Sequence, residues 1–353
     1  MSTTVESPLA WETVVDDAPV ALSARAGLVA LAGAEGTVKV LDAATGAETG
    51  SFALPGGALS IALSPDAGHL VATGPLGYAL WRRSDGRTTV RESGAWSAAA
   101  VWADGMGVSA AEQGQGRGKV AVASGRRALV LDAEGHELWR TEPAASTVTD
   151  LAWMRRGRRL AVAAYGAVRC HERHTEKPVA TYPYLGSHLA LAVAPTGQWI
   201  CSGNQDASIH IWRTRDGSEL TMSGYPEKVS RLAFDDTGFW LAADGAPDVT
   251  VWDFSGQGPE GRAPRSLRCH ETVTALAWRP GAAGHLVSGG DDGTVALWHA
   301  TAGRPQGRLR PVREQEGTGE AVTALAWAGP HLLVVARRDG RTRTYGVPSR
   351  TSL

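Results

Sequence analysis

Two short stretches of this chain carry residue types that bind phosphate or metal. Gly114–Lys119 is glycine-rich and ends in lysine, but a phosphate-binding loop needs Ser or Thr after the lysine and a helix beyond it. Here Val120 and a strand-like run follow, which favours a loop insertion. Cys170, His171 and His174 are metal-ligand types, yet neighbours on a strand point to opposite faces and no second Cys/His pair has zinc spacing. We expect no metal site and no cofactor.

A third group has the residue types of a serine-hydrolase triad. His270, Ser288 and Asp292 lie within one stretch of short apolar runs. The chain contains neither a Gly-x-Ser-x-Gly elbow nor a His-Glu-x-x-His helix motif. The positions of these residues follow a repeat that runs along the whole chain, so we interpret them as structural. We predict that the protein has no catalytic residues and is not an enzyme.

Composition narrows the classes of protein further. The 353 residues carry a formal net charge of −1, so no broad cationic field is available for nucleic acid or anionic membranes. Three widely separated cysteines do not form a disulfide framework. No basic start followed by an apolar run precedes Val20, and the apolar runs are too short for a membrane helix. A cytoplasmic protein is expected, and the arginine-, alanine- and glycine-rich composition indicates a bacterial source.

The elements that position these residues are short strands. Val273–His299 contains three apolar runs, separated by Pro/Gly turns and by the tight hairpin signal Gly289–Gly293. A fourth, weaker run follows at Gly307–Arg310. The 43 glycines and 18 prolines interrupt any helical periodicity. The stretch therefore predicts one four-stranded antiparallel sheet.

The same pattern recurs along the chain. The third strands of the successive units end 39 to 50 residues apart. Their ends lie near Leu41, Trp81, Leu131, Cys170, Trp212, Trp252, Trp298 and Tyr345. The first strand of four units ends near a tryptophan, at Trp102, Trp153, Trp278 and Trp327. This period predicts an all-β propeller that forms a single domain over residues 1–353, with eight four-stranded blades and seven as the alternative. The run Ala10–Val15 is predicted to close the ring as the outer strand of the last blade.

The repeat resembles that of WD40 propellers. Trp252-Asp253 is an intact WD dipeptide, Leu41-Asp42 and Leu131-Asp132 are related to it, and Ser64-Pro65-Asp66 is similar to the family's turn between the first two strands. The resemblance implies a buried hydrogen-bonded tetrad in the seventh unit, made by His270, Ser288, Asp292 and Trp298. It implies a partial tetrad in the fifth, made by Ser202, Asp206 and Trp212. We expect Asp292→Ala to cost about 1–3 kcal/mol.

The resemblance also implies a function. In WD40 propellers, the loops between the second and third strands and between successive blades gather on one face that binds peptides and proteins. We therefore expect a non-catalytic scaffold or adaptor with a protein or peptide partner and no membrane partner; nucleic acid is not expected. Aromatic and arginine side chains dominate interfaces, and those on these loops are Trp96, Tyr165, Tyr184, Tyr225, Arg337 and Arg338.

Two alternatives stay open. One is a propeller hydrolase or lyase with its site at the mouth of the central channel, which needs convergent carboxylates or histidines. The other is a nucleic-acid-binding module that uses arginine-rich loops, such as Arg155–Arg159 or the cluster of Arg337, Arg338, Arg341 and Arg343.

Overall fold

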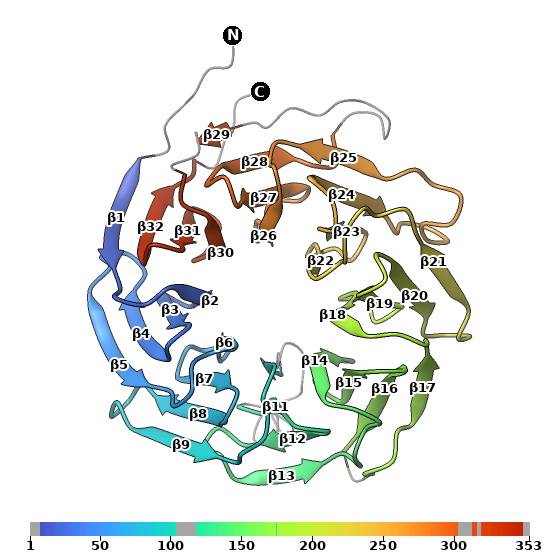
Figure 1. Ribbon diagram of the computed structural model, residues 1–353, viewed down its shortest axis with the longest axis horizontal. Coiled ribbons are helices and arrows are strands. Elements are labelled where there is room, and N and C mark those ends of the chain that lie inside the picture. Colours follow the sequence, from blue (N-terminus) through green and yellow to red (C-terminus); the bar gives the residue numbers. More distant parts are fainter. Residues whose placement is uncertain (1–7, 104–117, 174, 303–312, 316–318, 349–353) are drawn as a thin grey trace. The chain divides into compact units, whose positions relative to one another are not determined.

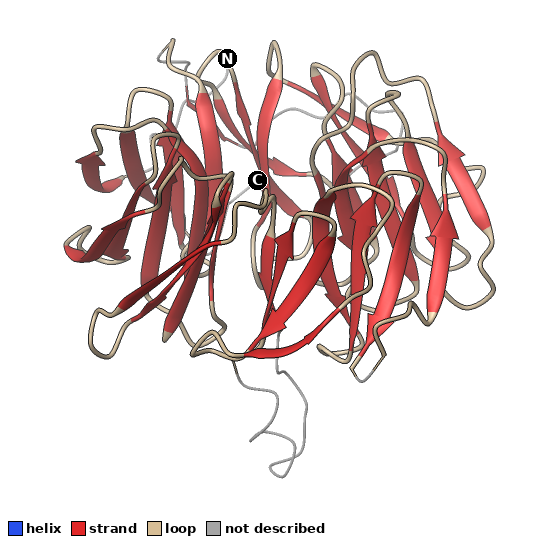
Figure 2. Cartoon of the chain, turned by 60° about the horizontal axis from the view of Figure 1, so that its bottom comes forward, coloured by secondary structure: helices blue, strands red, loops and turns tan. Residues whose placement is uncertain are grey.

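The strands of the computed structural model form eight four-stranded antiparallel sheets, the blades of a β-propeller (Figure 1). The structure describes residues 8–103, 118–173, 175–302, 313–315 and 319–348. No helix occurs among them (Figure 2), and so no helix there could cross a membrane. The all-β prediction with eight blades is confirmed. By its internal contacts the chain divides into two units, Val20–Val193 (the 20–193 unit) and Ala194–Leu353 with Met1–Pro19 (the 194–353 unit).

The 20–193 unit contains the first four blades and one further strand. Within each blade, the four strands are called A to D in chain order. The first two blades are β2 (Pro19–Arg25), β3 (Leu28–Gly33), β4 (Thr37–Asp42) and β5 (Glu48–Ala53), then β6 (Ser60–Leu63), β7 (His69–Gly74), β8 (Gly77–Arg82) and β9 (Thr88–Glu92). The next two are β10 (Ala100–Trp102), β11 (Val120–Ser124), β12 (Arg127–Leu131) and β13 (Glu137–Arg140), then β14 (Val148–Met154), β15 (Arg159–Ala164), β16 (Ala167–Glu172) and β17 (Ala180–Pro183). The further strand is β18 (His188–Val193).

The 194–353 unit contains the remaining strands. They are β19 (Trp199–Asn204), β20 (Ile209–Arg213) and β21 (Glu219–Met222), followed by β22 (Leu232–Phe234), β23 (Trp240–Ala243), β24 (Asp248–Asp253) and β25 (Arg265–Arg268). The seventh blade is β26 (Val273–Trp278), β27 (His285–Gly290), β28 (Val295–His299) and β29 (Arg313–Gln315). The eighth is β30 (Val322–Trp327), β31 (Leu332–Arg337), β32 (Arg341–Gly346) and β1 (Leu9–Val14). The predicted run Gly307–Arg310 lies outside the described residues.

The last blade takes its outer strand from the beginning of the chain. β1 pairs antiparallel with β32, with Trp11 opposite Thr344 and Val14 opposite Arg341. The backbone nitrogen of Val15 donates to the carbonyl oxygen of Gly340 at 3.1 Å, which continues the pairing beyond the strand. The prediction that the N-terminal run completes the last blade is confirmed.

Burial follows the position of a strand within its blade. The B strands β3 and β7 are buried at nearly every residue, and Leu28 and Ala30 of β3 share one apolar cluster with Leu70 and Ala72 of β7. The D strands β5, β9 and β13 are mostly exposed. This pattern explains why the inner runs of the sequence are continuously apolar while the outer runs are polar.

Tryptophans at the ends of the A strands join successive blades. The indole nitrogen of Trp102 donates to the carbonyl oxygen of Ala62 at 2.9 Å, within the 20–193 unit. In the 194–353 unit, Trp278 donates to Ala233 at 2.9 Å in the same way. Each bond runs from one A strand to the A strand of the preceding blade. The recurrence of tryptophan at this position therefore has a direct structural reason.

Candidate functional site

The B–C turns and D–A loops of the 20–193 unit lie at one end of its sheets, the loop end. Backbone hydrogen bonds tie each turn to a neighbouring loop. Ser97 N donates to Gly74 O at 3.1 Å, and Val148 N donates to Gly125 O at 2.8 Å. Gly166 N–H···O=C Gly186 repeats the contact one blade further, at 3.1 Å. These bonds hold the loops in a fixed shape before any partner arrives.

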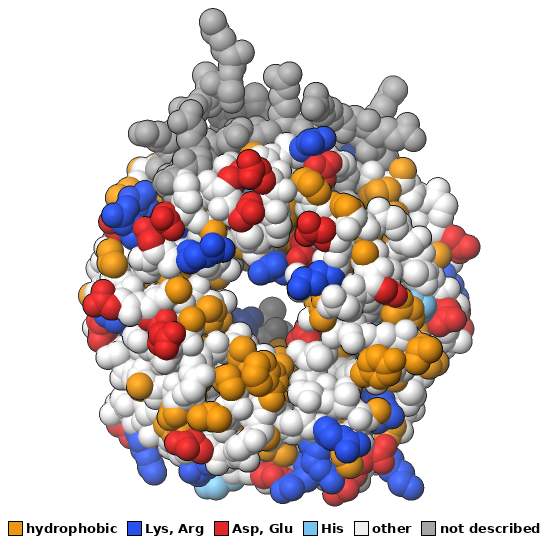
Figure 3. Space-filling model, viewed as in Figure 1, with side chains coloured by type: hydrophobic (Ala, Val, Ile, Leu, Met, Phe, Trp, Pro, Cys, Tyr) orange, Lys and Arg blue, Asp and Glu red, His pale blue; other side chains and the backbone are white. Residues whose placement is uncertain are grey.

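Large apolar side chains are exposed along this end. Trp96 and Tyr165 are each 48% exposed, Leu76 is 43% exposed and Leu185 is 85% exposed. Tyr184 is partly buried, and its ring lies 5.8 Å from that of His188. We call Leu76, Trp96, Tyr165, Tyr184 and Leu185 the loop row. Figure 3 shows hydrophobic side chains exposed in the lower part of the view, where Figure 1 places the strands of the 20–193 unit.

Three of the predicted partner-binding residues, Trp96, Tyr165 and Tyr184, belong to the loop row. The sequence reasoning passed over Leu76 and Leu185 because it considered only aromatic and arginine side chains. The sequence did contain a signal for Leu185. This leucine stands alone between Tyr184 and Gly186 in a D–A loop, so it is not part of a strand that would bury it in a sheet. Such a residue is either covered by a neighbouring loop or left in solvent, and Leu185 is left in solvent.

Tyr225, predicted to contact a partner, is partly buried, and its hydroxyl is bound within its own blade. Trp252 Nε1 donates to Tyr225 Oη at 2.9 Å, and Thr250 Oγ1 lies 2.8 Å from the same oxygen. Burial raises the pKa of Tyr225 to about 12, and the bonds to Thr250 and Trp252 lower it only in part. Tyr225 therefore supplies the hydrogen-bond partner of the WD tryptophan in the sixth blade.

Arg337, also predicted to contact a partner, is only 2% exposed. Its Nη1 donates to the carbonyl oxygens of Gly293 at 2.8 Å and Glu320 at 3.0 Å. Burial lowers the pKa of its guanidinium. Arg337 thus joins the B–C turn of the seventh blade to the segment that enters the eighth, while Arg338 beside it is exposed.

The structure brings three of the four predicted tetrad residues of the seventh blade into hydrogen-bond contact. Ser288 Oγ lies 2.7 Å from His270 Nε2 and accepts a bond from Trp298 Nε1 at 2.8 Å. Asp292 Oδ1 is 3.9 Å from His270 Nδ1, beyond hydrogen-bond distance, and accepts from Thr294 N at 2.8 Å. All three contacting side chains are buried in the blade, so the set has no open position for a substrate.

The residues of the partial tetrad in the fifth blade bind other neighbours. The Ser202 hydroxyl donates to Asn204 Oδ1 at 3.1 Å, and Asp206 accepts from the Ser208 hydroxyl at 2.7 Å. Trp212 is buried and packs against His210, with ring centroids 4.6 Å apart. His210, which the sequence reasoning did not select, faces Thr221 Oγ1 at 2.8 Å through Nδ1. These contacts are internal to the blade.

The two stretches whose residue types could bind metal or phosphate, Cys170–His174 and Gly114–Lys119, are described only in part. The described cysteine and histidine make contacts inside the protein. Cys170 is buried beside Met154, and burial raises the pKa of its thiol to about 12. His171 Nδ1 lies 3.1 Å from the carbonyl oxygen of Glu176. His174 lies outside the described residues, as does most of Gly114–Lys119. Among the described histidines, cysteines and carboxylates, no group of three or more could hold a metal ion.

Arginines of the two basic runs form ion pairs in the structure. Arg159 pairs with Glu172 at 2.5 Å, and Arg341 lies 3.5 Å from Asp339. Arg343 pairs with Glu12 of the N-terminal strand. These pairs reduce the charge that the runs present to solvent.

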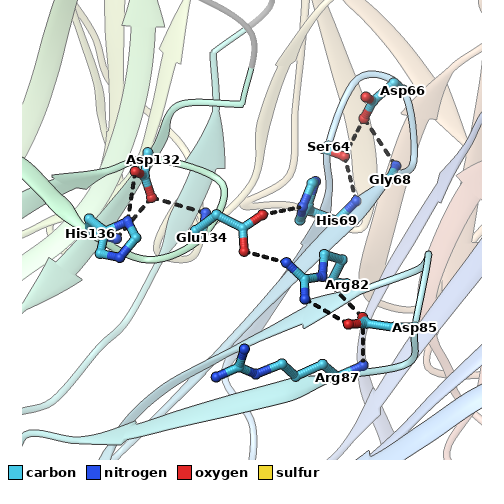
Figure 4. A network of polar contacts seen from close by, with 10 residues as sticks. All are labelled: Ser64, Asp66, Gly68, His69, Arg82, Asp85, Arg87, Asp132, Glu134 and His136. Atoms are coloured by element: carbon cyan, nitrogen blue, oxygen red, sulfur yellow. Dashed lines mark hydrogen bonds and ion pairs between the residues drawn. The ribbon is translucent and has the colours of Figure 1, made fainter.

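A polar network joins the A–B and C–D turns at the other end of the sheets of the 20–193 unit (Figure 4). Arg82 binds Asp85 through Nε at 3.0 Å and Nη2 at 2.6 Å, and Glu134 of the next blade through Nη1 at 2.5 Å. His69 Nε2 lies 3.7 Å from the other oxygen of Glu134. The bond to Arg82 holds the pKa of Asp85 at about 2, with help from the backbone of Arg87. The network fixes the C–D turn of the third blade against the second.

Comparisons with known proteins agree with this repeat. The sequence model of the family "WD domain, G-beta repeat" matches residues 177–213 and 261–299. The first segment covers β17 to β20, and the second covers β25 to β28. The two matched segments both lie in the second half of the sequence.

Curated relatives match parts of the chain. The small ribosomal subunit protein RACK1y of Oryza sativa subsp. japonica is 26% identical over 177 residues, which are 47% of this chain and 49% of that protein. A ribosome biogenesis protein WDR12 homolog of Chlamydomonas reinhardtii is 29% identical over 40% of this chain and 32% of that protein. The chain thus spans less than half the length of either relative.

Two solved structures match nearly the whole chain. The computationally designed Ika8 protein has a TM-score of 0.77 and 22% identity, and covers 97% of this chain and 100% of its own. Sqt1 from Chaetomium thermophilum has a TM-score of 0.79 and 17% identity, with the same coverage. At these identities the likeness shows the fold alone.

Proposed function

We propose that this protein is a non-catalytic scaffold that recruits a protein partner through the loop row of the 20–193 unit. The observation that carries the proposal is the exposure of four large apolar side chains at one end of consecutive blades. Exposed apolar groups that gather on one face are typical of protein interaction sites. We further propose that this protein acts in the cytoplasm of a bacterium as a single domain.

The rigidity of the loops supports this role. Gly125 N donates to Trp96 O at 2.9 Å, and Tyr165 N donates to Ser146 Oγ at 3.0 Å, so the backbones that carry these two rings are held in place. Association costs less when the interface side chains are already ordered, and tryptophan and tyrosine bury a large area with few rotatable bonds. The loop row combines both properties.

The relatives are consistent with a role in assemblies. One carries the name of a small ribosomal subunit protein and another that of a ribosome biogenesis protein. We propose for this chain only the general property of a subunit that binds other proteins.

The test is affinity capture from the source organism with tagged full-length protein. A triple variant, Trp96→Ser, Tyr165→Ser and Leu185→Ser, removes most of the loop row. The matched control is Val90→Ser with Leu138→Ser, because these residues are 37% and 45% exposed on outer strands of the same unit. We expect a protein that the wild type and the control retain and the triple variant loses. Equal recovery with all three would refute the proposed surface, and purified components must reproduce the difference.

A further inference from the structure

A groove of about 200 Å³ lies along the outer strand of the second blade. Arg87, Thr89 and Arg91 line one side, and Glu134 and His136 from the C–D turn of the third blade line the other. The buried side chain of Leu80 contributes to its floor. We call this feature the rim groove. It is formed within the 20–193 unit by residues outside the loop row.

Arg82 also lines the rim groove, but its charge is already matched. Asp85 and Glu134 both bind its guanidinium, so a ligand would have to break two ion pairs to use it. The same contacts engage Glu134, the one carboxylate in the lining, and reduce its repulsion of an anion. The Arg82–Glu134 bond therefore holds the two sides of the rim groove together at this end.

Arg87 and Arg91 are different, because both are exposed and neither forms an ion pair within the described part of the chain. In Figure 4 the Arg87 side chain runs away from Asp85, toward the side on which Glu134 and His136 lie. Because Asp85 and Glu134 bind Arg82, the charge that the lining offers to a ligand comes from the two positive side chains Arg87 and Arg91. The groove thus favours an anionic ligand.

The spacing of these residues follows the strand. Thr89 and Arg91 lie two positions apart on β9, and Arg87 directly precedes the strand. The carbonyl oxygen of Arg87 accepts from Arg82 N at 2.9 Å, which continues the pairing with β8, so alternation places the three side chains on one face with about 13 Å between the two arginines. β9 is the last strand of its sheet and has no neighbouring strand on its outer edge among the described residues. A peptide added along that edge would place every second side chain over the rim groove.

The other outer strands of the 20–193 unit lack this combination. β5 and β17 contain neither arginine nor lysine. In β13, Arg140 forms an ion pair with Glu137 at 2.5 Å. Among the described outer strands of this unit, two arginines without an ion pair are therefore found only at β9, with Arg91 in the strand and Arg87 directly before it.

We propose that the rim groove binds an extended acidic segment of a protein, which pairs with the free edge of β9 and directs two carboxylates four positions apart toward Arg87 and Arg91. Thr89 lies between the two arginines and supplies a hydroxyl to the bound segment. The interaction is separate from the proposed function of the loop row.

The test is the fluorescence anisotropy of a labelled peptide of about nine residues, with two glutamates four positions apart in a threonine and valine background. We expect saturable binding to the full chain that weakens as salt screens the charges. The double variant Arg87→Gln and Arg91→Gln should weaken it by about tenfold or more. The matched control is Arg83→Gln, an exposed arginine of the same turn outside the groove lining.

Two further arms separate strand addition from simple charge attraction. A peptide with its two glutamates adjacent should bind more weakly than the spaced peptide, and the loop-row triple variant should bind the spaced peptide as the wild type does. Three results would overturn the proposal: no binding of the spaced peptide, equal binding by the Arg87/Arg91 variant, or equal affinity for the two glutamate arrangements. None of these results bears on capture through the loop row.

Discussion

The indole nitrogen of Trp153 donates a hydrogen bond to the carbonyl oxygen of Val101 at 2.9 Å and joins the fourth blade to the third. Trp102, Trp278 and Trp327 make the same bond to the preceding A strand in their own units. Each bond connects segments about 40 to 50 residues apart, so the tryptophan at the end of strand A stabilises the contact between blades as well as its own sheet.

Replacing Trp153 with phenylalanine should therefore destabilise the protein. The change keeps an aromatic ring but leaves the Val101 oxygen without its donor, which costs about 1 kcal/mol. Trp153→Ala should cost more, about 3–5 kcal/mol, because packing is lost as well. Urea unfolding followed by circular dichroism measures both. Trp96→Phe is the control, since this exposed ring makes no such bond to any residue that the structure describes. Equal destabilisation by Trp96→Phe and Trp153→Phe would contradict the role of the bond.

The hydrogen bonds of the tetrad in the seventh blade predict which of two substitutions destabilises the protein more. Ser288→Ala removes the oxygen that faces both His270 and Trp298, so two buried groups lose a partner and the free energy of unfolding should fall by about 2–4 kcal/mol. Asp292→Ala should cost about 1 kcal/mol, because this carboxylate accepts from Thr294 but lies beyond hydrogen-bond distance of His270. The same unfolding assay ranks the two variants, and a larger loss for Asp292→Ala would show that this carboxylate holds the tetrad together.

Histidines should make the protein less stable in mild acid. Burial lowers the pKa of His270, His171 and His299, in the last case together with the neighbouring His285. Well above pH 6.5, the ordinary pKa of histidine, these groups are neutral in both the folded and the unfolded states. As the pH falls below 6.5, the unfolded chain takes up protons that the folded protein resists, so stability decreases until the folded pKa values are reached.

Denaturation at a series of pH values between 7.5 and about 5 measures this effect. In the His270→Gln variant the free energy of unfolding should decrease less over that pH interval than in the wild type, although the variant is less stable at pH 7.5. A slope unchanged by the substitution would mean that His270 titrates alike in both states.

Arg337 should be a stability residue and not a binding residue. Arg337→Ala leaves the carbonyl oxygens of Gly293 and Glu320 without this donor and opens space in the blade, and we expect a loss of about 2–4 kcal/mol. Arg338→Ala changes an exposed neighbour and should stay within about 0.5 kcal/mol of the wild type. Thermal melts of the pair give the comparison, and a similar melting temperature for Arg337→Ala and the wild type would contradict the assignment.

Much of the fold could be predicted because each blade repeats one local pattern. Apolar runs of strand length, bounded by glycine and proline, were enough to place β26, β27 and β28. The run Ala10–Val15, which precedes the first unit, was enough to complete the eighth blade. The close contacts of His270, Ser288 and Trp298 followed from their positions in the repeat. These features depend on sequence spacing, which the strands preserve.

The functional surface was less predictable, because a side chain near a loop stays exposed only if it finds no hydrogen-bond partner inside the protein. Tyr225 and Arg337 lie next to loops, like Trp96 and Tyr165, but each has a polar end that finds partners inside a blade. The indole nitrogen of Trp252 donates to Tyr225, and not to a serine as the indole of Trp298 does. Arg337 donates to a backbone carbonyl oxygen, and no residue type in the sequence indicates such an acceptor. The rim groove was missed for a related reason, because Glu134 and Arg82 are 52 residues apart.

The loop row is the surface through which we propose that this protein binds its partner. Hydrogen–deuterium exchange of the full chain, alone and with its captured partner, tests this directly. We predict that the partner slows exchange in the segments 93–97, 144–147 and 184–187, with little change in the A–B and C–D turns at the opposite end. Protection confined to those turns, with the three segments unchanged, would contradict the central claim.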